Sequence, residues 1–421
     1  MALTGTRSVT AVLITGSSWF RPVPAAISNY ERGAQLTRAT SYPGGLFRKA
    51  IADAEPYVPG RTAVLLQQEH GIRGPVVKLS SNENPLGMSP AAERAIVEAA
   101  AAACGYPDDQ SLGLRRKLAE ELDVDIDNVL AGNGSSDVIY RLGAAMLELG
   151  DNVVMSKYSF NLLSIVTKMF GSELRAVEMD RYHHDLQAVL GAIDDRTKIV
   201  YVDLPNNPMG SDVADADFRR FVSRLPSHVL LVVDEAYLEF ADPEYRHGTI
   251  DLIREGRNVM VVRTFSKSHG LAGVRAGYAV GLPEMIAGLA VAGLPFSVNT
   301  LAQAAAEAAV DDKDFLARTV ELNRREREAL CAHLDREGIA YVPSQTNFVA
   351  IDLGSRAGAV VRSLEQSGVI VRHLAGYGLE NFIRVSLGTP EMNVRFIDAL
   401  TRALGEPFSG IAAADVEVDA R

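Results

Sequence analysis

A serine, a lysine and an arginine stand close together in the stretch that follows one short apolar run. Residues 259–262 are apolar and mostly β-branched, which predicts a buried strand, and Ser266, Lys267 and Arg275 follow it. A lysine in such a place can lose its proton and act as a nucleophile. Ser266 and the planar guanidinium of Arg275 can bind a phosphate. This combination indicates pyridoxal phosphate, joined to Lys267 as a Schiff base; the alternative is a surface turn that carries scattered basic residues.

Two further motifs follow other apolar stretches and would suit the ring of the same cofactor. Asp234 ends an apolar stretch, where a carboxylate can pair with a protonated pyridine nitrogen. Tyr237 is close behind it, and a proline-stiffened loop presents the amide of Asn207, so both side chains could reach the ring's phenolic oxygen. Taken alone, Asp234 could instead cap a helix, and Asn207 could belong to an ordinary Asn-Pro turn.

Small residues at 132–137 run from a predicted strand into a predicted helix. Backbone N–H groups of Gly134 and Ser135 can approach a phosphate there, and the helix dipole favours an anion. The turn lacks the third glycine of the dinucleotide fingerprint, and no Walker-type lysine follows it. After the next strand, Tyr158 could stack on a flat cofactor ring or serve only as a loop anchor.

The elements that would position these residues alternate regularly along the first two thirds of the chain. Near-continuous apolar strands separated by helices indicate an α/β fold with a mostly parallel sheet that is covered on both faces. Functional loops of such sheets lie beyond the carboxyl ends of the strands, where the candidate residues occur. Strands are expected at 129–131, 152–155, 173–177, 198–203, 230–234, 259–263 and 277–280, and helices at 136–149, 162–170, 186–192 and 215–223.

The pattern changes near residues 294–296. A long helix over about 300–337, with strands at 348–352, 369–372 and 382–386, predicts a second, smaller α+β domain. Residues 1–30 contain no acidic side chain, so a transit-like leader is an alternative to a flexible extension. The expected organisation is a flexible N-terminal extension (1–50), an N-terminal arm that belongs with the small domain (51–88), a large cofactor-binding domain (89–295), a small C-terminal domain (296–405) and a loose tail (406–421).

Bulk composition argues against several classes of function. The 421 residues are 47% hydrophobic and 23% charged, as in ordinary globular proteins. A net charge of −11 argues against a general nucleic-acid-binding protein. Cys104 and Cys331 stand alone, so neither a disulfide framework nor a metal site is expected, and a reducing, cytoplasmic setting fits. No apolar run approaches the length of a bilayer span, so no membrane partner is expected.

The order and spacing of Asn207, Asp234, Tyr237, Lys267 and Arg275 resemble those of the fold-type-I pyridoxal-phosphate aminotransferases of classes I and II. The similarity is strongest to the branch that contains the histidinol-phosphate aminotransferases, and it covers residues 54 to 404. It implies pyridoxal 5'-phosphate as the cofactor. The stretches that carry it are 56–60, 81–87, 234–240, 264–275, 295–299, 368–378 and 383–389.

The resemblance also implies a role for each candidate residue. In this family the lysine that matches Lys267 binds the cofactor covalently and then moves a proton between the substrate Cα and the cofactor C4′. The resemblance assigns the pyridine nitrogen to Asp234, and it implies that Tyr158 stacks on the ring. Asn207 and Tyr237 would hold the phenolic oxygen, and Gly134, Ser135, Ser266 and Arg275 would bind the phosphate.

Four further residues match groups that contact substrate or a second subunit in the family. Arg384 matches the arginine that binds the α-carboxylate of glutamate or 2-oxoglutarate, and Arg372 and Tyr57 match groups that contact the phosphate of histidinol phosphate. An arginine pair suits a site that must accept a dicarboxylate and a phosphate monoester by turns. Tyr106 matches a tyrosine that reaches the cofactor phosphate of the other subunit, which implies a homodimer with shared active sites.

The reaction that the resemblance implies is ping-pong transfer of an amino group between histidinol phosphate, or a similar donor, and 2-oxoglutarate. The alternatives are an aminotransferase for phenylalanine or tyrosine, one of specialised metabolism, and a decarboxylase of the threonine-phosphate type. Met209 stands where the family usually has threonine, and His269 where a bulky hydrophobic or aromatic residue is commoner. These two departures leave the substrate open.

Overall fold

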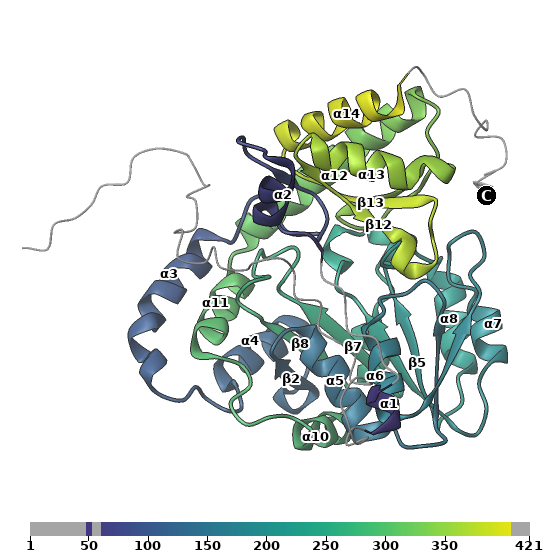
Figure 1. Cartoon of the computed structure of the whole chain (residues 1–421). Coiled ribbons are helices and arrows are strands. Elements are labelled where there is room, and N and C mark those ends of the chain that lie inside the picture. Colours follow the sequence, from purple (N-terminus) through teal and green to yellow (C-terminus); the bar gives the residue numbers. More distant parts are fainter. Residues whose placement is uncertain (1–47, 53–59, 406–421) are drawn as a thin grey trace, which may run out of the picture.

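The computed structural model describes residues 48–52 and 60–405. The expectations for Tyr57, for most of the N-terminal extension and for the C-terminal tail lie outside these residues. Figure 1 shows a large body built around a central sheet, with a smaller body, formed mainly by the last part of the chain, stacked on one end of it. No helix of the described part is long and apolar enough to cross a membrane.

Seven strands of the described chain form the central sheet, in the order β2-β8-β7-β6-β5-β3-β4. All neighbours in it are parallel except β8, which runs antiparallel to both β2 and β7. This confirms the expected α/β fold with a mostly parallel sheet. The strands are β2 (Val129–Gly132), β3 (Asn152–Ser156), β4 (Glu173–Val177), β5 (Thr197–Asp203), β6 (Leu230–Asp234), β7 (Val259–Thr264) and β8 (Gly277–Val280).

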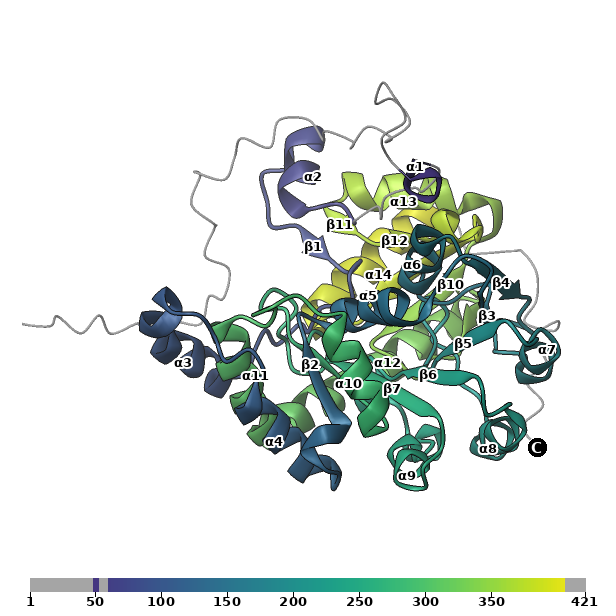
Figure 2. The ribbon, with the colours of Figure 1, turned by 90° about the horizontal axis from the view of Figure 1, so that it is seen from below.

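Helices cover both faces of this sheet because successive strand residues point to opposite sides. In β5, Val200 and Val202 belong to one apolar core, whereas Ile199 and Tyr201 belong to the other. In Figure 2 the strands lie between α5 and α6 on one side and α8 and α9 on the other. The first face is covered by α5 (Ser135–Met146), α6 (Leu162–Phe170) and α10 (Pro283–Val291), and the second by α4 (Leu112–Leu122), α7 (Leu186–Gly191), α8 (Asp215–Arg224) and α9 (Thr249–Arg254).

A second sheet of four antiparallel strands, in the order β12-β13-β10-β9, forms the core of the smaller body in the described chain. The N-terminal arm joins this body, because β1 (Val77–Lys78) pairs in parallel with β11 (Val369–Ile370). The strands are β9 (Tyr341–Val342), β10 (Phe348–Asp352), β12 (Arg372–His373) and β13 (Phe382–Ser386), and α12 (Lys313–Arg336), α13 (Ala357–Gln366) and α14 (Pro390–Leu404) pack against them.

Two expectations for this part of the chain are wrong. The helix expected over 300–337 is divided into α11 (Thr300–Asp311) and α12, because Asp312 leaves the helical conformation and its side chain accepts a hydrogen bond from the Phe315 amide. The strand expected at 369–372 is divided between two sheets, since β11 pairs with β1 whereas β12 pairs with β13. The first break is a local N-cap at Asp312, whereas the second follows from the pairing of β11 and β12 with different sheets.

The segment before the central sheet is helical. α3 (Pro90–Ala99) begins as predicted, with Ser89 as its N-cap and proline in its first turn, and α11 packs against it. It continues into the short 3-10 helix Ala100–Cys104, which ends at Gly105. The remaining short helices are α1 (Lys49–Ala52), α2 (Ala63–His70) and the 3-10 turns Ile126–Asn128, Leu238–Phe240, Pro243–Tyr245, Gly354–Arg356 and Leu374–Tyr377.

Gly277, the first residue of β8, permits a close approach to the start of α5. A Cβ atom at this position would lie 2.3 Å from the backbone nitrogen of Ser135 and 2.6 Å from the carbonyl carbon of Gly134. Gly277→Ala should therefore lower the free energy of unfolding by about 1–3 kcal/mol, measured by urea denaturation. Gly288→Ala is the matched control: Gly288 lies inside α10 with no atom in the way, so this change should be neutral or stabilising. Equal destabilisation by both changes would contradict the prediction.

Candidate active site

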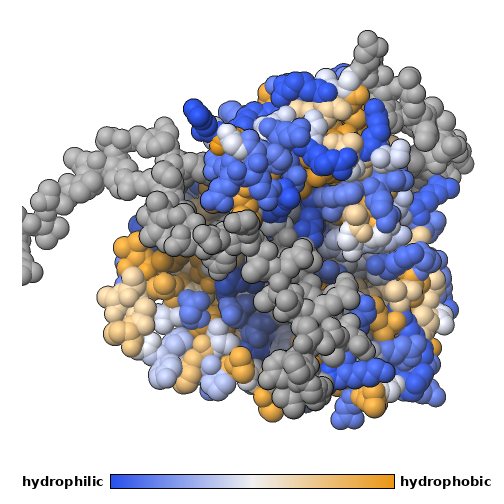
Figure 3. All heavy atoms as spheres, in the orientation of Figure 1, coloured by the Kyte–Doolittle hydropathy of each residue, from blue (hydrophilic) through white to orange (hydrophobic). Residues whose placement is uncertain are grey.

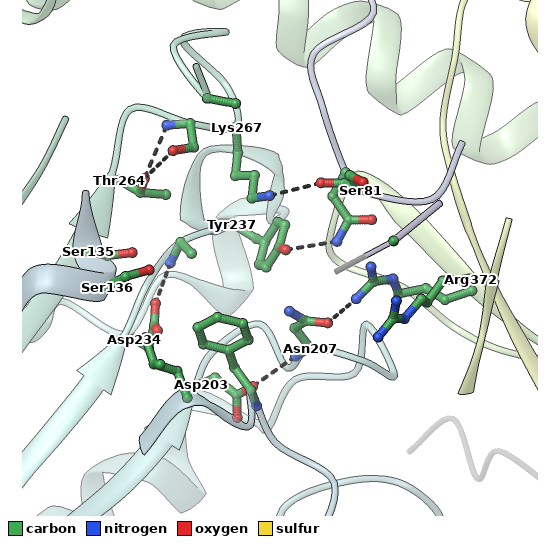
Figure 4. Close-up of a pocket in the computed structure, with 18 of the residues that line it drawn as sticks. Ser81, Ser135, Ser136, Asp203, Asn207, Asp234, Tyr237, Thr264, Lys267 and Arg372 are labelled. Carbon is green, nitrogen blue, oxygen red and sulfur yellow. Dashed lines mark hydrogen bonds between the residues drawn. The ribbon is translucent and has the colours of Figure 1, made fainter. Parts of the chain in front are cut away.

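A cavity of about 520 Å³ opens where the carboxyl ends of β5, β6 and β7 face the second sheet. The large body supplies most of its lining, and the second sheet supplies two arginines. Figure 4 shows the side chains of the two bodies pointing toward one another. Of the residues singled out from the sequence, those that line the cavity are Ser135, Asn207, Asp234, Tyr237, Ser266, Lys267, Arg275, Arg372 and Arg384.

Lys267 follows β7, and its amine points into the cavity. Nζ donates a hydrogen bond to the carbonyl oxygen of Ser81, 3.1 Å away, and lies 5.8 Å from the centre of the Tyr237 ring. Burial lowers the pKa of this amine to about 8, and the positive charge of Arg384 acts in the same direction. Because a larger share of the amine is then neutral at moderate pH, Lys267 is suited to attack a carbonyl carbon.

Asp234 is the last residue of β6 and is buried at the floor of the cavity. Its Oδ2 accepts a hydrogen bond from the Tyr201 hydroxyl at 2.7 Å, and its Oδ1 accepts one from the Ala236 amide at 3.1 Å. Burial raises the pKa of this carboxyl to about 7, and no cation among the described residues offsets the effect. A cationic group placed against Asp234 would therefore be strongly favoured.

Tyr237 and Asn207 are each fixed by a neighbouring side chain and point into the cavity (Figure 4). The Asn82 amide donates a hydrogen bond to the Tyr237 hydroxyl at 2.8 Å. The side-chain oxygen of Asn207 accepts a hydrogen bond from a guanidinium nitrogen of Arg384. The hydroxyl and the amide group could therefore meet one oxygen of a bound ring from fixed directions.

The start of α5 and the loop after β7 form a seat for an anion. Gly134 caps α5 with a φ of 78°, and a Cβ atom there would lie 2.3 Å from Nη2 of Arg275. Ser135 and Ser136 begin the helix, and both line the cavity together with Ser266. A helix N-terminus, a guanidinium and several hydroxyls provide the donors that a phosphate dianion requires.

Tyr158 does not line the cavity, which corrects the expectation that it stacks on a cofactor ring. It packs beside Tyr182, with ring centroids 6.5 Å apart, and Phe160 lines the cavity in its place. Two hydrogen bonds determine this turn: the Tyr158 carbonyl oxygen accepts one from Asn206, and the Phe160 amide donates one to Asp203. Phe160, two positions after Tyr158, is therefore the aromatic residue that faces the cavity.

Other expected residues lie away from the cavity of their own chain. Tyr106 is 84% exposed and stacks on Phe296, with ring centroids 4.6 Å apart. Met209 is buried in an apolar cluster beside Tyr158. His269 lines a separate cavity and packs edge-on against Phe265. The two departures from the family pattern thus do not contact the cavity in which Lys267 lies.

Several residues at the site were not predicted. Asn82 fixes Tyr237 and Tyr201 fixes Asp234, although these partners are 155 and 33 residues apart in the sequence, so no local pattern marks them. Asp203 carried a signal, because it is a charged residue at the end of an apolar strand, as Asp234 is.

The fold and the site together indicate the class of protein to which this chain belongs. The solved histidinol-phosphate aminotransferase from Sinorhizobium meliloti, in complex with pyridoxal-5'-phosphate, is 30% identical, with a TM-score of 0.79 over 86% of this chain and 98% of that one. An aspartate aminotransferase of Thermus thermophilus, 23% identical, has the same fold, with a TM-score of 0.73 over 85% of this chain and 99% of its own. The architecture is that of the fold-type-I aminotransferases.

Residues 74–400 match the family model "Aminotransferase class I and II", and the chain belongs to this family. It is 43% identical over 360 residues to histidinol-phosphate aminotransferase 2 of Pseudomonas aeruginosa, which covers 85% of this chain and 98% of that protein. It is 42% identical over 359 residues to the histidinol-phosphate aminotransferase of Symbiobacterium thermophilum, with 85% and 99% covered. The protein is a pyridoxal-phosphate-dependent aminotransferase, as the sequence predicted.

The cavity fits pyridoxal 5'-phosphate by the chemistry of its donors. Asp234 is a buried carboxylate that pairs with no cation in the described part of the chain, which suits a protonated ring nitrogen, and the seat at α5 suits the phosphate. When bound, the cofactor supplies an aldehyde for the amine and a ring that withdraws electrons from the substrate Cα. The described residues contain no cluster of side chains that could hold a metal ion.

Lys267→Ala should abolish the covalent bond between protein and cofactor, because no other lysine of the described chain lines the cavity. After borohydride treatment and denaturation, the wild type should retain one cofactor per chain by intact-protein mass spectrometry, and the variant none. Lys78→Ala is the matched control, since Lys78 is a nearby lysine that pairs with Glu83. Cofactor that stays fixed to the Lys267→Ala protein would show that the nucleophile is another residue.

The depressed pKa of Lys267 predicts how fast the cofactor-free protein takes up its cofactor at each pH. Only the neutral amine attacks, and its fraction is half at a pH of about 8 rather than at the ordinary 10.5. The rate of covalent attachment, followed by stopped-flow absorbance, should reach half its maximum at a pH of about 8 and level off roughly one pH unit higher. A rate that keeps rising beyond pH 10 would mean that the buried amine titrates as an exposed one does.

Proposed function

We propose that this aminotransferase moves an amino group between histidinol phosphate and 2-oxoglutarate in a ping-pong cycle. The observation that supports this choice most is the pair Arg372 and Arg384, which are directly opposite each other on β12 and β13 and both line the cavity. Opposite residues of antiparallel strands place their side chains on the same face. The names of the two relatives described above, which are 43% and 42% identical to this chain, point to the same donor.

Arg384 is suited to a carboxylate. It is buried, it donates to the Ser80 carbonyl oxygen at 3.1 Å, and its Nε has no hydrogen-bond partner among the described residues. Its guanidinium would hold the α-carboxylate of 2-oxoglutarate, while Arg372 would take the second carboxylate or the phosphate of histidinol phosphate. Because histidinol phosphate has no α-carboxylate, the two half-reactions would use the pair differently.

The cofactor contacts belong to the same proposal. Lys267 would bind the cofactor and, once its amine is free again, accept the proton from the substrate Cα. Asp234 would meet the ring nitrogen, and Phe160 would lie against the ring. Asn207 and Tyr237 would hold the phenolic oxygen, and the phosphate would be bound by Gly134, Ser135, Ser266 and Arg275.

We further propose a homodimer with shared sites, in a cytoplasmic setting. Tyr106 and its stacking partner Phe296 lie open to solvent, and Val97 of α3 and Leu294 after α10 are 70% and 77% exposed. Figure 3 shows hydrophobic residues gathered over α3 on this face. Apolar side chains gathered at a surface favour an interface, and Tyr106 of a second copy could then reach the phosphate seat.

An aromatic amino donor is the second candidate. Phe160, Leu162 and Tyr377 add apolar surface to the same cavity, which could accept the side chain of phenylalanine or tyrosine. Such a donor carries an α-carboxylate for Arg384 but offers Arg372 no anion. The two arginines therefore distinguish the candidates.

Arg372→Ala should lower kcat/KM for histidinol phosphate by about 100-fold, because one partner of a charge-assisted hydrogen bond to phosphate is lost. The value for phenylalanine, with 2-oxoglutarate held at saturation, should change less than about fivefold, since no anion of this donor depends on Arg372. Steady-state assays with both donors measure the difference. Arg402→Ala, at an exposed arginine of α14, is the control and should change neither value. Equal losses for both donors would contradict the role of Arg372.

A further inference from the structure

Asp203 lines the cavity but belongs to none of the cofactor contacts proposed above. It is the last residue of β5, its side chain is buried, and it lies opposite Asp234 in the parallel pair of β5 and β6. Figure 4 shows its carboxylate at the edge of the cavity beside Asn207. A buried carboxylate is costly unless donors bind its oxygens, so its hydrogen bonds show what it holds.

One oxygen of this carboxylate holds two separate loops. Oδ2 of Asp203 accepts hydrogen bonds from the Asn207 amide at 2.9 Å and from the Phe160 amide at 3.1 Å. Phe160 comes after β3 and Asn207 after β5, and both side chains line the cavity. The positions of the two side chains are therefore set by the same atom.

The other oxygen strengthens the same connection. Oδ1 of Asp203 accepts a hydrogen bond from the Asn206 side chain at 3.1 Å, and the Asn206 nitrogen also donates to the Tyr158 carbonyl oxygen at 2.9 Å. The loop after β5 is thus tied to the loop after β3 a second time. No backbone pairing of strands lies between the two loops here, because β3 ends at Ser156 and β5 at Asp203.

His184 lies behind this carboxylate and contacts it. Its Nε2 lies 3.0 Å from the carbonyl oxygen of Asp203 and 3.4 Å from Oδ1, and its Nδ1 lies 2.7 Å from the Ser156 hydroxyl. Burial lowers the pKa of His184, but the hydrogen bond and charge of Asp203 outweigh it, so the net pKa is raised. Asp212 adds a smaller attraction in the same direction. A carboxylate can accept hydrogen bonds on both of its oxygens, as Asp203 does here.

We propose that Asp203 is a positioning residue that fixes the spacing between Phe160 and Asn207 and so sets the slot for the cofactor ring. Phe160 would lie against the face of the ring and Asn207 at its phenolic oxygen, and a shift of either loop would loosen the fit or tilt the ring. The inference rests on the role proposed for Asn207 but not on the identity of the amino donor. If Asp203 had only a structural role, it would stabilise the fold without affecting the orientation of the bound ring.

Asp203→Asn in the full chain tests this. An amide keeps the size of the side chain, but it has one acceptor oxygen where the carboxylate has two, and its NH₂ group meets donors on either side. The dissociation constant of pyridoxal phosphate should rise about tenfold, the size expected for losing hydrogen bonds to a charged group. The visible circular dichroism of the bound cofactor, which reports the orientation of its ring, should change as well.

Asp194→Asn is the matched control. Asp194 precedes β5 and accepts a hydrogen bond from Asn152 of β3 at 2.8 Å, so it connects the same two strands at the opposite end. It should lower the thermal unfolding midpoint while the cofactor's dissociation constant and visible circular dichroism stay at wild-type values.

Cofactor affinity and circular dichroism that are unchanged in Asp203→Asn would overturn the proposal. If that variant does not fold, Ser156→Ala is the second test, since it removes only the hydroxyl that holds His184. This variant should weaken cofactor binding about threefold, because one neutral hydrogen bond is lost. The visible circular dichroism of the bound cofactor should change as well, since the ring would tilt. Wild-type values of both quantities would overturn the proposal. Neither readout uses a substrate, so an error in the proposed donor leaves the test unaffected.

Discussion

Asp234 and Lys267 lie in one buried cavity, where the cost of removing charge from water acts on both. Burial raises the pKa of the Asp234 carboxyl to about 7 and lowers the pKa of the Lys267 amine to about 8. The charged form of each group is therefore destabilised. Bound pyridoxal phosphate would relieve both costs, since its protonated ring nitrogen would give Asp234 a cation and its aldehyde would react with the neutral amine of Lys267. The cavity is thus suited to a cofactor with a protonated ring nitrogen and an aldehyde.

The remaining architecture serves to bring these groups together from distant parts of the chain. Three neighbouring parallel strands deliver Asp203, Asp234 and Lys267 to one edge of the central sheet. The second sheet brings Arg372 and Arg384 against that edge in a fixed register, and Arg384 contacts Asn207 across the two bodies. Under the proposed roles, cofactor chemistry would depend on residues of the large body, and substrate choice would depend on how the two arginines of the smaller body are placed against it.

The sequence predicted most of the fold and most of the residues that line the cavity, because both depend on local sequence patterns. Apolar runs mark the strands, and the reactive residues stand where those runs end, as Asp234 and Lys267 do. Tyr158 was misplaced because a turn of two residues decides which aromatic ring faces inward, and the hydrogen bonds that decide it come from residues 203 and 206, far along the chain. The break at Asp312 was missed for a different reason, since helical pattern continues on both sides of it and only a local side-chain cap marks it.

Histidinol phosphate is the amino donor that we propose for this cavity. The most direct measurement mixes purified holoenzyme with histidinol phosphate in the absence of any oxo acid and follows the cofactor absorbance and the ketone formed. We expect one equivalent of ketone per active site, with the amino group kept by the enzyme until 2-oxoglutarate is added. A complete reaction with phenylalanine and none with histidinol phosphate would contradict it.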